Sequence, residues 1–244
     1  MKQHLEFDLN RYFTRIRLTV FSLGLLPLLY LIQGYVRDHL GINPFQVIMS
    51  VTGHSALIFL CLSLAITPLR RWLTALFKIR SISHRAKWGK RLSDWNVMIR
   101  CRRMIGLYSF FYASLHLFGY LHLELSWLYA ELIWEIDARP PILYGIIAWS
   151  LLLLLAITSP SLLQRKLKKW WRRIHRLAYP LSLIACYHYL QISKVTDDLP
   201  YLYLALLSVL LGHRIVVRHI GKLKRPEDTG MESPPRSKTL QAPQ

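Results

Sequence analysis

The sequence has few acidic residues, few cysteines and no nucleotide-binding motif. Only 13 Asp and Glu accompany 32 Lys and Arg, and none lies within a long apolar run, so the paired intramembrane carboxylates of a proton-driven transporter are missing. The three cysteines are odd in number and widely spaced, and no CxxCH is present, which excludes a disulfide framework and covalent c-type haem attachment. Without a GxGxxG or a P-loop, the chain has no nicotinamide- or ATP-binding domain.

Long apolar runs separated by basic clusters dominate the 244 residues, of which 53% are hydrophobic. A helix needs about 20 apolar residues to cross the hydrocarbon core of a bilayer. Backbone polar groups in lipid must be satisfied within the segment, so runs of this length predict helices. We therefore predict an all-α membrane protein with six transmembrane helices. The predicted spans are 18–36, 47–67, 104–123, 142–158, 177–193 and 200–217.

The positive charge is placed unevenly between the runs. A net charge of +19 would suit nucleic acid, but the Lys and Arg lie between the spans, where they anchor to lipid headgroups. With a cytoplasmic N-terminus, 29 of the 32 fall in inner segments, and only Arg37, Arg139 and Lys194 in outer loops. This asymmetry predicts that both termini face the cytoplasm and that the chain lies in the inner (plasma) membrane of a bacterium.

Three parts follow from these spans: an N-terminal cytoplasmic segment at 1–17, a membrane domain at 18–218 and a cytoplasmic tail at 219–244. The tail is rich in Pro, Ser and charge from Pro226 onward, which predicts disorder. Within the long inner segment, residues 72–77 have the pattern of a short amphipathic helix in the membrane interface.

Two histidines lie at matching depth within predicted spans. His116 is 12 residues from the inner end of its span, near Met104, and His188 is 11 residues from Leu177. The two depths differ by only ~1–2 Å at the helical rise. Intramembrane imidazoles are costly and usually functional, and a pair at one level suits the two axial ligands of a haem iron. The alternative is that each histidine is a polar residue hydrogen-bonded between helices.

Other candidate site residues surround this pair. His175, at the inner boundary, would bind a second cofactor, compete with His188 for the same iron, or face headgroups. Arg102 and Arg103 would hold haem propionates or a flavin phosphate, although headgroup anchoring is their default role. His54 would contact a propionate or act as a ligand, but a polar residue in a packing seam beside Gly53 is the better interpretation.

Short motifs in a fixed order resemble the ferric-reductase-like transmembrane family, and within it the haem-binding membrane subunits of bacterial periplasmic methionine sulfoxide reductase systems. Each motif is weak alone, but their order and spacing are specific. The motifs lie at 52–53, 64–70, 102–107, 112–116, 139–140, 145–149, 158–159 and 165–167, and in the segments around His175 and His188.

The resemblance implies a haem b, with the family histidines at His116, His175 and His188, and an associated flavin mononucleotide (FMN). It also implies electrons from the quinone pool or a cytoplasmic flavin reductase, and delivery to MsrP, a periplasmic molybdopterin enzyme that reduces methionine sulfoxide. Two features depart from the family pattern: the inner segment 72–99 is longer, and His54 stands where an Arg is expected.

Three functions therefore remain open from the sequence. The first is an electron-transfer subunit for protein repair, without catalysis of its own. The second is a self-contained haem-dependent ferric or metal reductase of the same fold. The third is a cofactor-free transporter that uses the histidines as a proton relay.

Overall fold

The computed structural model describes residues 2–81, 96–193 and 197–223, and every regular element within them is helical. The elements are α1 (Lys2–Val36), α2 (Pro44–Ser81), α4 (Asn96–Leu123), α5 (Tyr129–Ala138), α6 (Pro140–Ile157), α7 (Ser161–Ile174), η1 (His175–Leu177), α8 (Ala178–Ile192) and α9 (Leu199–Leu223). The predicted all-α class is confirmed, and the chain is a multi-pass membrane protein.

Five segments are long and apolar enough to cross a membrane: Thr14–Val36, Pro44–Leu69, Cys101–Leu123, Pro140–Ile157 and Leu199–Val217. They coincide with five of the six predicted spans. The remaining predicted span corresponds to α8, which has 15 residues and is therefore only ~22 Å long. The sixth crossing remains a prediction, and so does the orientation of the termini.

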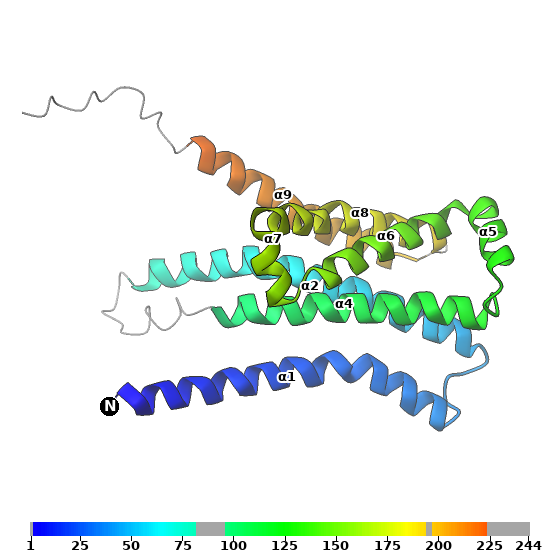
Figure 1. Cartoon of the computed structure of the whole chain (residues 1–244), viewed down its shortest axis with the longest axis horizontal. Helices are drawn as coiled ribbons and strands as arrows, with labels where there is room; N and C mark the ends of the chain where they lie inside the picture. The colour runs from blue at the N-terminus through cyan, green and yellow to red at the C-terminus, as the bar shows by residue number, and fades with distance from the viewer. Residues whose placement is uncertain (1, 82–95, 194–196, 224–244) are drawn as a thin grey trace, which may run out of the picture.

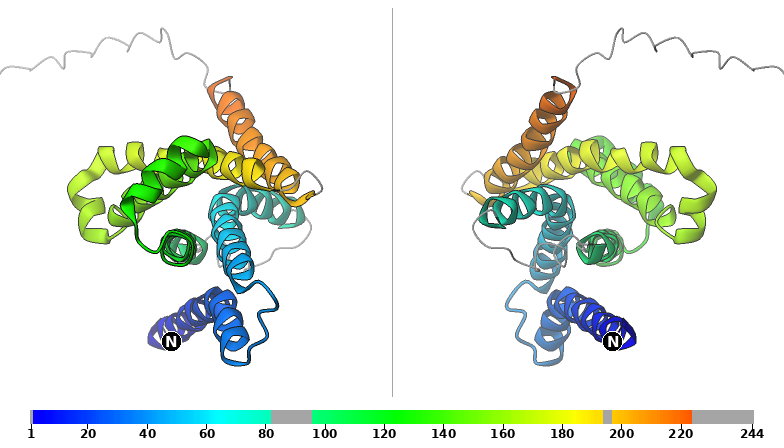
Figure 2. Two further views of the ribbon diagram at one scale, coloured as in Figure 1. Left: turned by 90° about the vertical axis from the view of Figure 1, so that its right-hand side faces the viewer. Right: turned by 90° about the vertical axis from the view of Figure 1, so that its left-hand side faces the viewer.

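The long helices run roughly side by side, and the chain alternates between the two ends of the bundle (Figure 1). The start of α1, the end of α2 and the start of α4 lie at one end, which we call the inner end. The short helix α5 lies at the other, the outer end. The most extensive packing joins α2 to α4 and α6 to α8. Seen end-on, α1 lies at the edge of the bundle, where it contacts α2 and α4 (Figure 2).

A tyrosine hydroxyl holds α1 against α4. Pro27 interrupts the backbone hydrogen-bond ladder of α1 because it has no N–H. The hydroxyl of the fully buried Tyr112, on α4, lies within this irregular turn. It accepts from the Leu28 N–H at 3.2 Å and donates to the Gly24 carbonyl at 2.7 Å. Both backbone groups are thus satisfied in an apolar environment, and the position of α1 relative to α4 is fixed.

Several predicted boundaries differ from the observed ones. Helix α1 begins at Lys2, so the segment predicted before the first span is helical. No separate helix forms at 72–77, because α2 continues to Ser81. Helix α9 continues to Leu223, and the rest of the predicted tail lies outside the described residues. In each case the helix continues past its apolar span into a basic segment, where the hydropathy of the sequence falls.

Candidate functional site

His116 of α4 and His188 of α8 face each other inside the bundle. Their ring centroids are 6.4 Å apart and their ring planes are perpendicular. Both side chains are partly buried. The depth match in the sequence therefore corresponds to a direct juxtaposition of the two rings.

Both rings are held by hydrogen bonds at Nδ1. His116 Nδ1 lies 3.1 Å from the Met49 carbonyl and 3.3 Å from the Thr52 hydroxyl. His188 Nδ1 lies 2.7 Å from the Pro141 carbonyl. A carbonyl can only accept, so in the neutral imidazole each Nδ1 carries the proton and each Nε2 keeps a free lone pair. This is the arrangement of a metal-binding histidine, whose other nitrogen donates to a backbone carbonyl.

A glycine packs against each of the two rings. A Cβ built on Gly53, in α2, would lie 3.2 Å from Cε1 and Nδ1 of His116. One built on Gly145, in α6, would lie 2.7 Å from Cε1 and 3.1 Å from Nε2 of His188. The space that each ring occupies exists only because the neighbouring helix has no side chain there. Both glycines lie in motifs that carry the family resemblance.

The donor set fits a haem better than a bare metal ion. Across the described ranges, no group of three or more His, Cys, Asp and Glu side chains is placed to hold a metal. Zinc would require three or four protein ligands, whereas a haem iron needs only axial ones because the macrocycle supplies the rest. Two imidazoles bound on opposite sides of one metal at ~2.0–2.1 Å would have ring centroids ~6–6.5 Å apart. The observed separation agrees with this.

The remaining inner-end candidates form a second cluster. His175 lies in η1, between α7 and α8. Its Nε2 is 3.3 Å from the Thr158 hydroxyl, and its ring centroid is 4.3 Å from that of Trp171. Burial lowers the pKa of His175, a hydrogen bond with the Thr158 backbone opposes this, and the charges of Arg102 and Arg103 lower it further. The positive charges of the two arginines therefore act on the His175 ring.

His175 and His188 do not share one helix. The chain changes from α7 through the short helix η1 before α8 begins at Ala178. The break lies just before Pro180, which has no backbone N–H to donate to the preceding turn. His175 therefore belongs to the inner end and His188 to the deeper pair.

His54 has partners at both ring nitrogens. Nδ1 lies 2.8 Å from the Ser50 carbonyl, and Nε2 lies 3.0 Å from the Tyr189 hydroxyl. That hydroxyl is in turn 3.0 Å from a carboxylate oxygen of Asp197. The network connects α2 and α8 to the segment before α9. This agrees with the interpretation of His54 as a polar residue in a packing seam.

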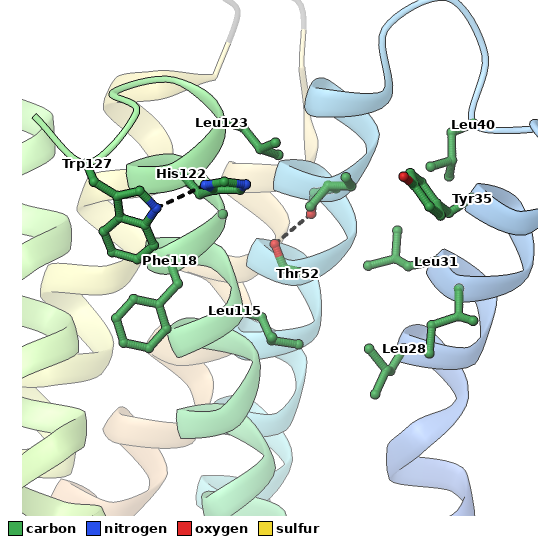
Figure 3. Close-up of a pocket in the computed structure, with 13 residues that line it drawn as sticks. Leu28, Leu31, Tyr35, Leu40, Thr52, Leu115, Phe118, His122, Leu123 and Trp127 are labelled. Atoms are coloured by element: carbon green, nitrogen blue, oxygen red, sulfur yellow. Dashed lines mark hydrogen bonds between the residues drawn. The ribbon is translucent and has the colours of Figure 1, made fainter.

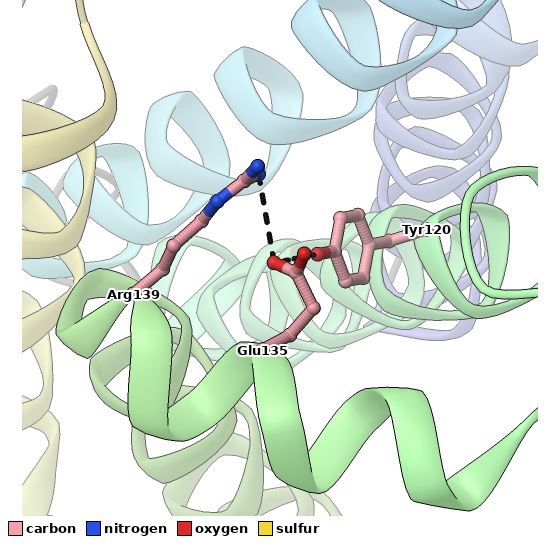
Figure 4. Close-up of polar contacts among 3 residues, drawn as sticks. All are labelled: Tyr120, Glu135 and Arg139. Carbon is pink, nitrogen blue, oxygen red and sulfur yellow. Dashed lines mark hydrogen bonds and ion pairs between the residues drawn. The ribbon is translucent and has the colours of Figure 1, made fainter.

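A buried carboxylate fixes the outer ends of α4 and α6. Glu135 of α5 accepts a hydrogen bond from Tyr120 of α4 at 3.2 Å and pairs with Arg139 at 3.5 Å (Figure 4). Its side chain is almost completely buried. Arg139 immediately precedes α6, and the carbonyl that holds His188 belongs to Pro141 in the first turn of that helix. The network therefore supports the position of one hydrogen-bond partner of the histidine pair.

Sequence reasoning did not identify the groups that orient the two rings. The carbonyls of Met49 and Pro141 belong to the backbone, so no residue type marks them. The glycines at 53 and 145 were visible as parts of motifs, but their contact with the rings depends on how the helices pack. A glycine within an apolar run was the only available signal, and it indicates close approach without naming the partner.

Comparison with known proteins agrees with this geometry. The family described as ferric reductase like transmembrane component matches residues 52–186, which include His116, His175 and both glycines. A Xanthomonas euvesicatoria protein named "Protein-methionine-sulfoxide reductase heme-binding subunit MsrQ" is 43% identical over 73% of this chain and 72% of its own length. A protein of the same name from Pectobacterium carotovorum is 36% identical over 82% of this chain and 92% of its own length. The chain therefore belongs to the ferric-reductase-like transmembrane family, and its relatives include the MsrQ proteins.

Proposed function

We propose that this protein is the haem-binding, electron-transfer membrane subunit of a methionine sulfoxide reductase system. Electrons would enter from the quinone pool or from a cytoplasmic flavin reductase. They would leave to MsrP, a periplasmic molybdopterin enzyme that reduces methionine sulfoxide in oxidised proteins. The observation that carries the proposal is the facing pair His116 and His188, with Nδ1 of each ring held by a carbonyl and Nε2 left for a metal.

The names of the relatives support this function over the alternatives. The MsrQ proteins are described as heme-binding subunits of a methionine-sulfoxide reductase. A subunit of this kind needs no catalytic residues, which agrees with the absence of a hydrolytic or nucleotide-binding motif in this sequence. The distribution of Lys and Arg supports an inner end in the cytoplasm, so the electrons would pass outward across the bundle.

Each residue of the site has a defined task in this proposal. His116 and His188 would ligate the iron through Nε2. The carbonyls of Met49 and Pro141 keep the Nδ1 protons in place and so hold the tautomer that a metal requires. When bound, haem b supplies a one-electron carrier. The surrounding apolar bundle keeps water away from it, which is one of the factors that set its potential.

The inner-end cluster provides a place for electron entry. The positive charges of Arg102 and Arg103 act on His175, whose ring packs against that of Trp171. A flavin phosphate would pair with the guanidinium groups, and a flat ring would stack on the indole. We therefore assign to this cluster the FMN, or the docking of the flavin reductase. His175 is the third candidate for haem ligation, at a second haem near the inner face.

Electron transfer to the periplasmic enzyme is testable with purified components. The haem of the reconstituted protein is reduced with dithionite, the excess reductant is removed, and MsrP is added with methionine sulfoxide. We expect rapid reoxidation that requires both additions, because the sulfoxide is reduced only by the partner. The control replaces both with ferric citrate. Reoxidation by ferric citrate, and none with MsrP and methionine sulfoxide, would favour the self-contained metal reductase instead.

A further inference from the structure

His54, Tyr189 and Asp197 form a chain of polar contacts in the outer half of the bundle. His54 Nε2 lies 3.0 Å from the Tyr189 hydroxyl, and that hydroxyl lies 3.0 Å from a carboxylate oxygen of Asp197. Asp197 is partly exposed and comes just before α9, whose first residues lie at the outer end (Figure 1). The contacts therefore lead from the outer aqueous phase to an imidazole within the span Pro44–Leu69.

This network lacks one proton while His54 is neutral. His54 Nδ1 lies 2.8 Å from the Ser50 carbonyl, which can only accept, so Nδ1 carries the ring proton and Nε2 is an acceptor. The ionised carboxylate of Asp197 is an acceptor as well. Tyr189 lies between these two acceptors and has a single hydroxyl proton, so one of its two contacts is left without a proton. Such an unmade hydrogen bond is costly where water is excluded.

One additional proton satisfies every contact in the network. With a proton on Nε2, His54 donates to the Tyr189 oxygen, and the Tyr189 hydroxyl donates to Asp197. The proton goes to the imidazole rather than to the carboxylate, because an imidazole binds protons more tightly. The negative charge of Asp197 also acts on His54 and favours a positive ring there. The contacts thus form a site for one proton.

The titratable groups that face His54 come from several elements. Among the described residues they are Tyr189 of α8, Tyr203 of α9, Asp197 before α9 and His116 of α4. Helix α1 also packs against α2, but no titratable group in its described part interacts with His54. Of the groups that face His54, Asp197 is the one that is charged at neutral pH. The charge that surrounds the ring therefore favours its protonation.

The turn of α2 that carries His54 also packs against His116. The Thr52 hydroxyl donates to the Ile48 carbonyl at 2.6 Å (Figure 3). The same hydroxyl lies 3.3 Å from His116 Nδ1, and Gly53 packs against the His116 ring. A charge on His54 acts on His116, and such interactions are weakly screened inside an apolar bundle. A change of charge at the histidine pair must therefore change how tightly His54 binds a proton.

We propose that His54 takes up one proton from the outer aqueous phase when the haem held by His116 and His188 is reduced, and releases it on oxidation. The proposal rests on the proposed function, because it requires that haem. One electron from the donor converts ferric iron to ferrous iron, and one proton adds to His54 Nε2 by way of Asp197 and Tyr189. The net charge of the site stays constant, which avoids an uncompensated charge in an apolar bundle. Oxidation by the periplasmic partner removes the electron, and the proton returns to the outer side.

The pH dependence of the haem midpoint potential tests this site. It is measured by redox titration of the full-length, haem-loaded protein in lipid nanodiscs, from about pH 5 to about pH 9, a range that brackets histidine titration. The potential of the wild type should fall as pH rises, because reduction binds a proton. Its steepest slope should approach one proton per electron, ~59 mV per pH unit for a one-electron couple. His54→Gln keeps hydrogen-bonding groups without a titrating ring and should lose this slope. Equal slopes in the two proteins, or no slope in the wild type, would overturn the proposal.

Two further variants sharpen the test. Asp197→Asn keeps an acceptor for the Leu199 N–H at the start of α9 but removes the negative charge. Protonated His54 then loses a favourable interaction, so the sloping region of the pH dependence should move to lower pH. The matched control is His213→Gln, because His213 is an imidazole of α9 that contacts Trp72 instead of this network. It should keep the wild-type slope. An unmoved region in Asp197→Asn, or loss of the slope in His213→Gln, would contradict the proposal.

Infrared difference spectroscopy identifies the group that binds the proton. Spectra of the reduced minus the oxidised protein are recorded with and without isotopically labelled histidine. We expect an imidazolium band that appears on reduction, shifts with the label and is absent in His54→Gln; a spectrum without such a band would overturn the proposal. Haem content measured on the same samples separates the two proposals. Haem-loaded protein with a potential that does not depend on pH contradicts only the proton site, whereas protein without haem contradicts the proposed function and this inference with it.

Discussion

Replacing either His116 or His188 with alanine is expected to remove the haem from the purified protein. The Soret band should fall at least 10-fold per chain, because a b-type haem is held by axial ligation without a covalent bond. Each substitution also leaves Nε2 of the opposite imidazole without a partner in an apolar site. The measurement is the haem-to-protein ratio, taken from the pyridine haemochrome spectrum and a quantitative protein assay.

The matched control is His213→Ala. His213 is another imidazole within the predicted membrane domain, and it accepts a hydrogen bond from Trp72 at 3.0 Å, between α9 and α2. This variant should keep its haem. That result would show that removing just any histidine of the membrane domain does not cause haem loss. Normal haem content in both His116→Ala and His188→Ala would refute the assignment of the pair. Loss in all three would indicate general misfolding.

Replacing Gly145 with alanine is expected to disturb haem binding without touching a ligand. The new Cβ would lie 2.7 Å from Cε1 of His188, closer than van der Waals contact allows, so the ring must move. That movement breaks the 2.7 Å hydrogen bond to Pro141 and shifts Nε2. Losing a partner that orients a metal ligand typically costs 10–100-fold in affinity, and we expect a loss of haem affinity in that range, measured by haem titration of the apoprotein.

Two other glycines provide graded controls for this prediction. Gly53→Ala places its Cβ 3.2 Å from the His116 ring, so a shift of a few tenths of an ångström relieves the contact and the effect should be smaller. Gly212→Ala, in α9, has no atom within 4 Å of the new Cβ and should bind haem like the parent protein. If all three variants bound haem equally, the close packing of Gly145 against His188 would have no role in the site.

The sequence predicted the histidine pair because depth in a membrane helix can be counted directly from residue number. His116 and His188 lie 12 and 11 residues from the inner ends of their spans, and the structure brings their rings into contact. The same counting could not give the direction of each ring. That direction depends on the carbonyls of Met49 and Pro141, which side-chain chemistry does not reveal.

The fold was predictable where hydropathy alone decides it and less so elsewhere. The five long spans follow from apolar runs, since lipid forces the backbone of such runs into helices. The sequence did not indicate α5 or its network, because Glu135 reads as an ordinary acidic loop residue until Tyr120 and Arg139 are packed against it. The sequence placed His175 at the inner boundary but left open whether it competes with His188 for one iron, because the break at η1 is set by the turn between α7 and α8.

Electron paramagnetic resonance of the oxidised wild-type protein at low temperature tests the central claim most directly. Two imidazoles on one iron make it low-spin, and perpendicular ring planes, as observed for His116 and His188, make the signal strongly anisotropic. The account predicts such a low-spin ferric signal, with a large maximum g value, in an amount equal to at least one iron per chain. A high-spin signal as the main species, or a protein without haem, would contradict it.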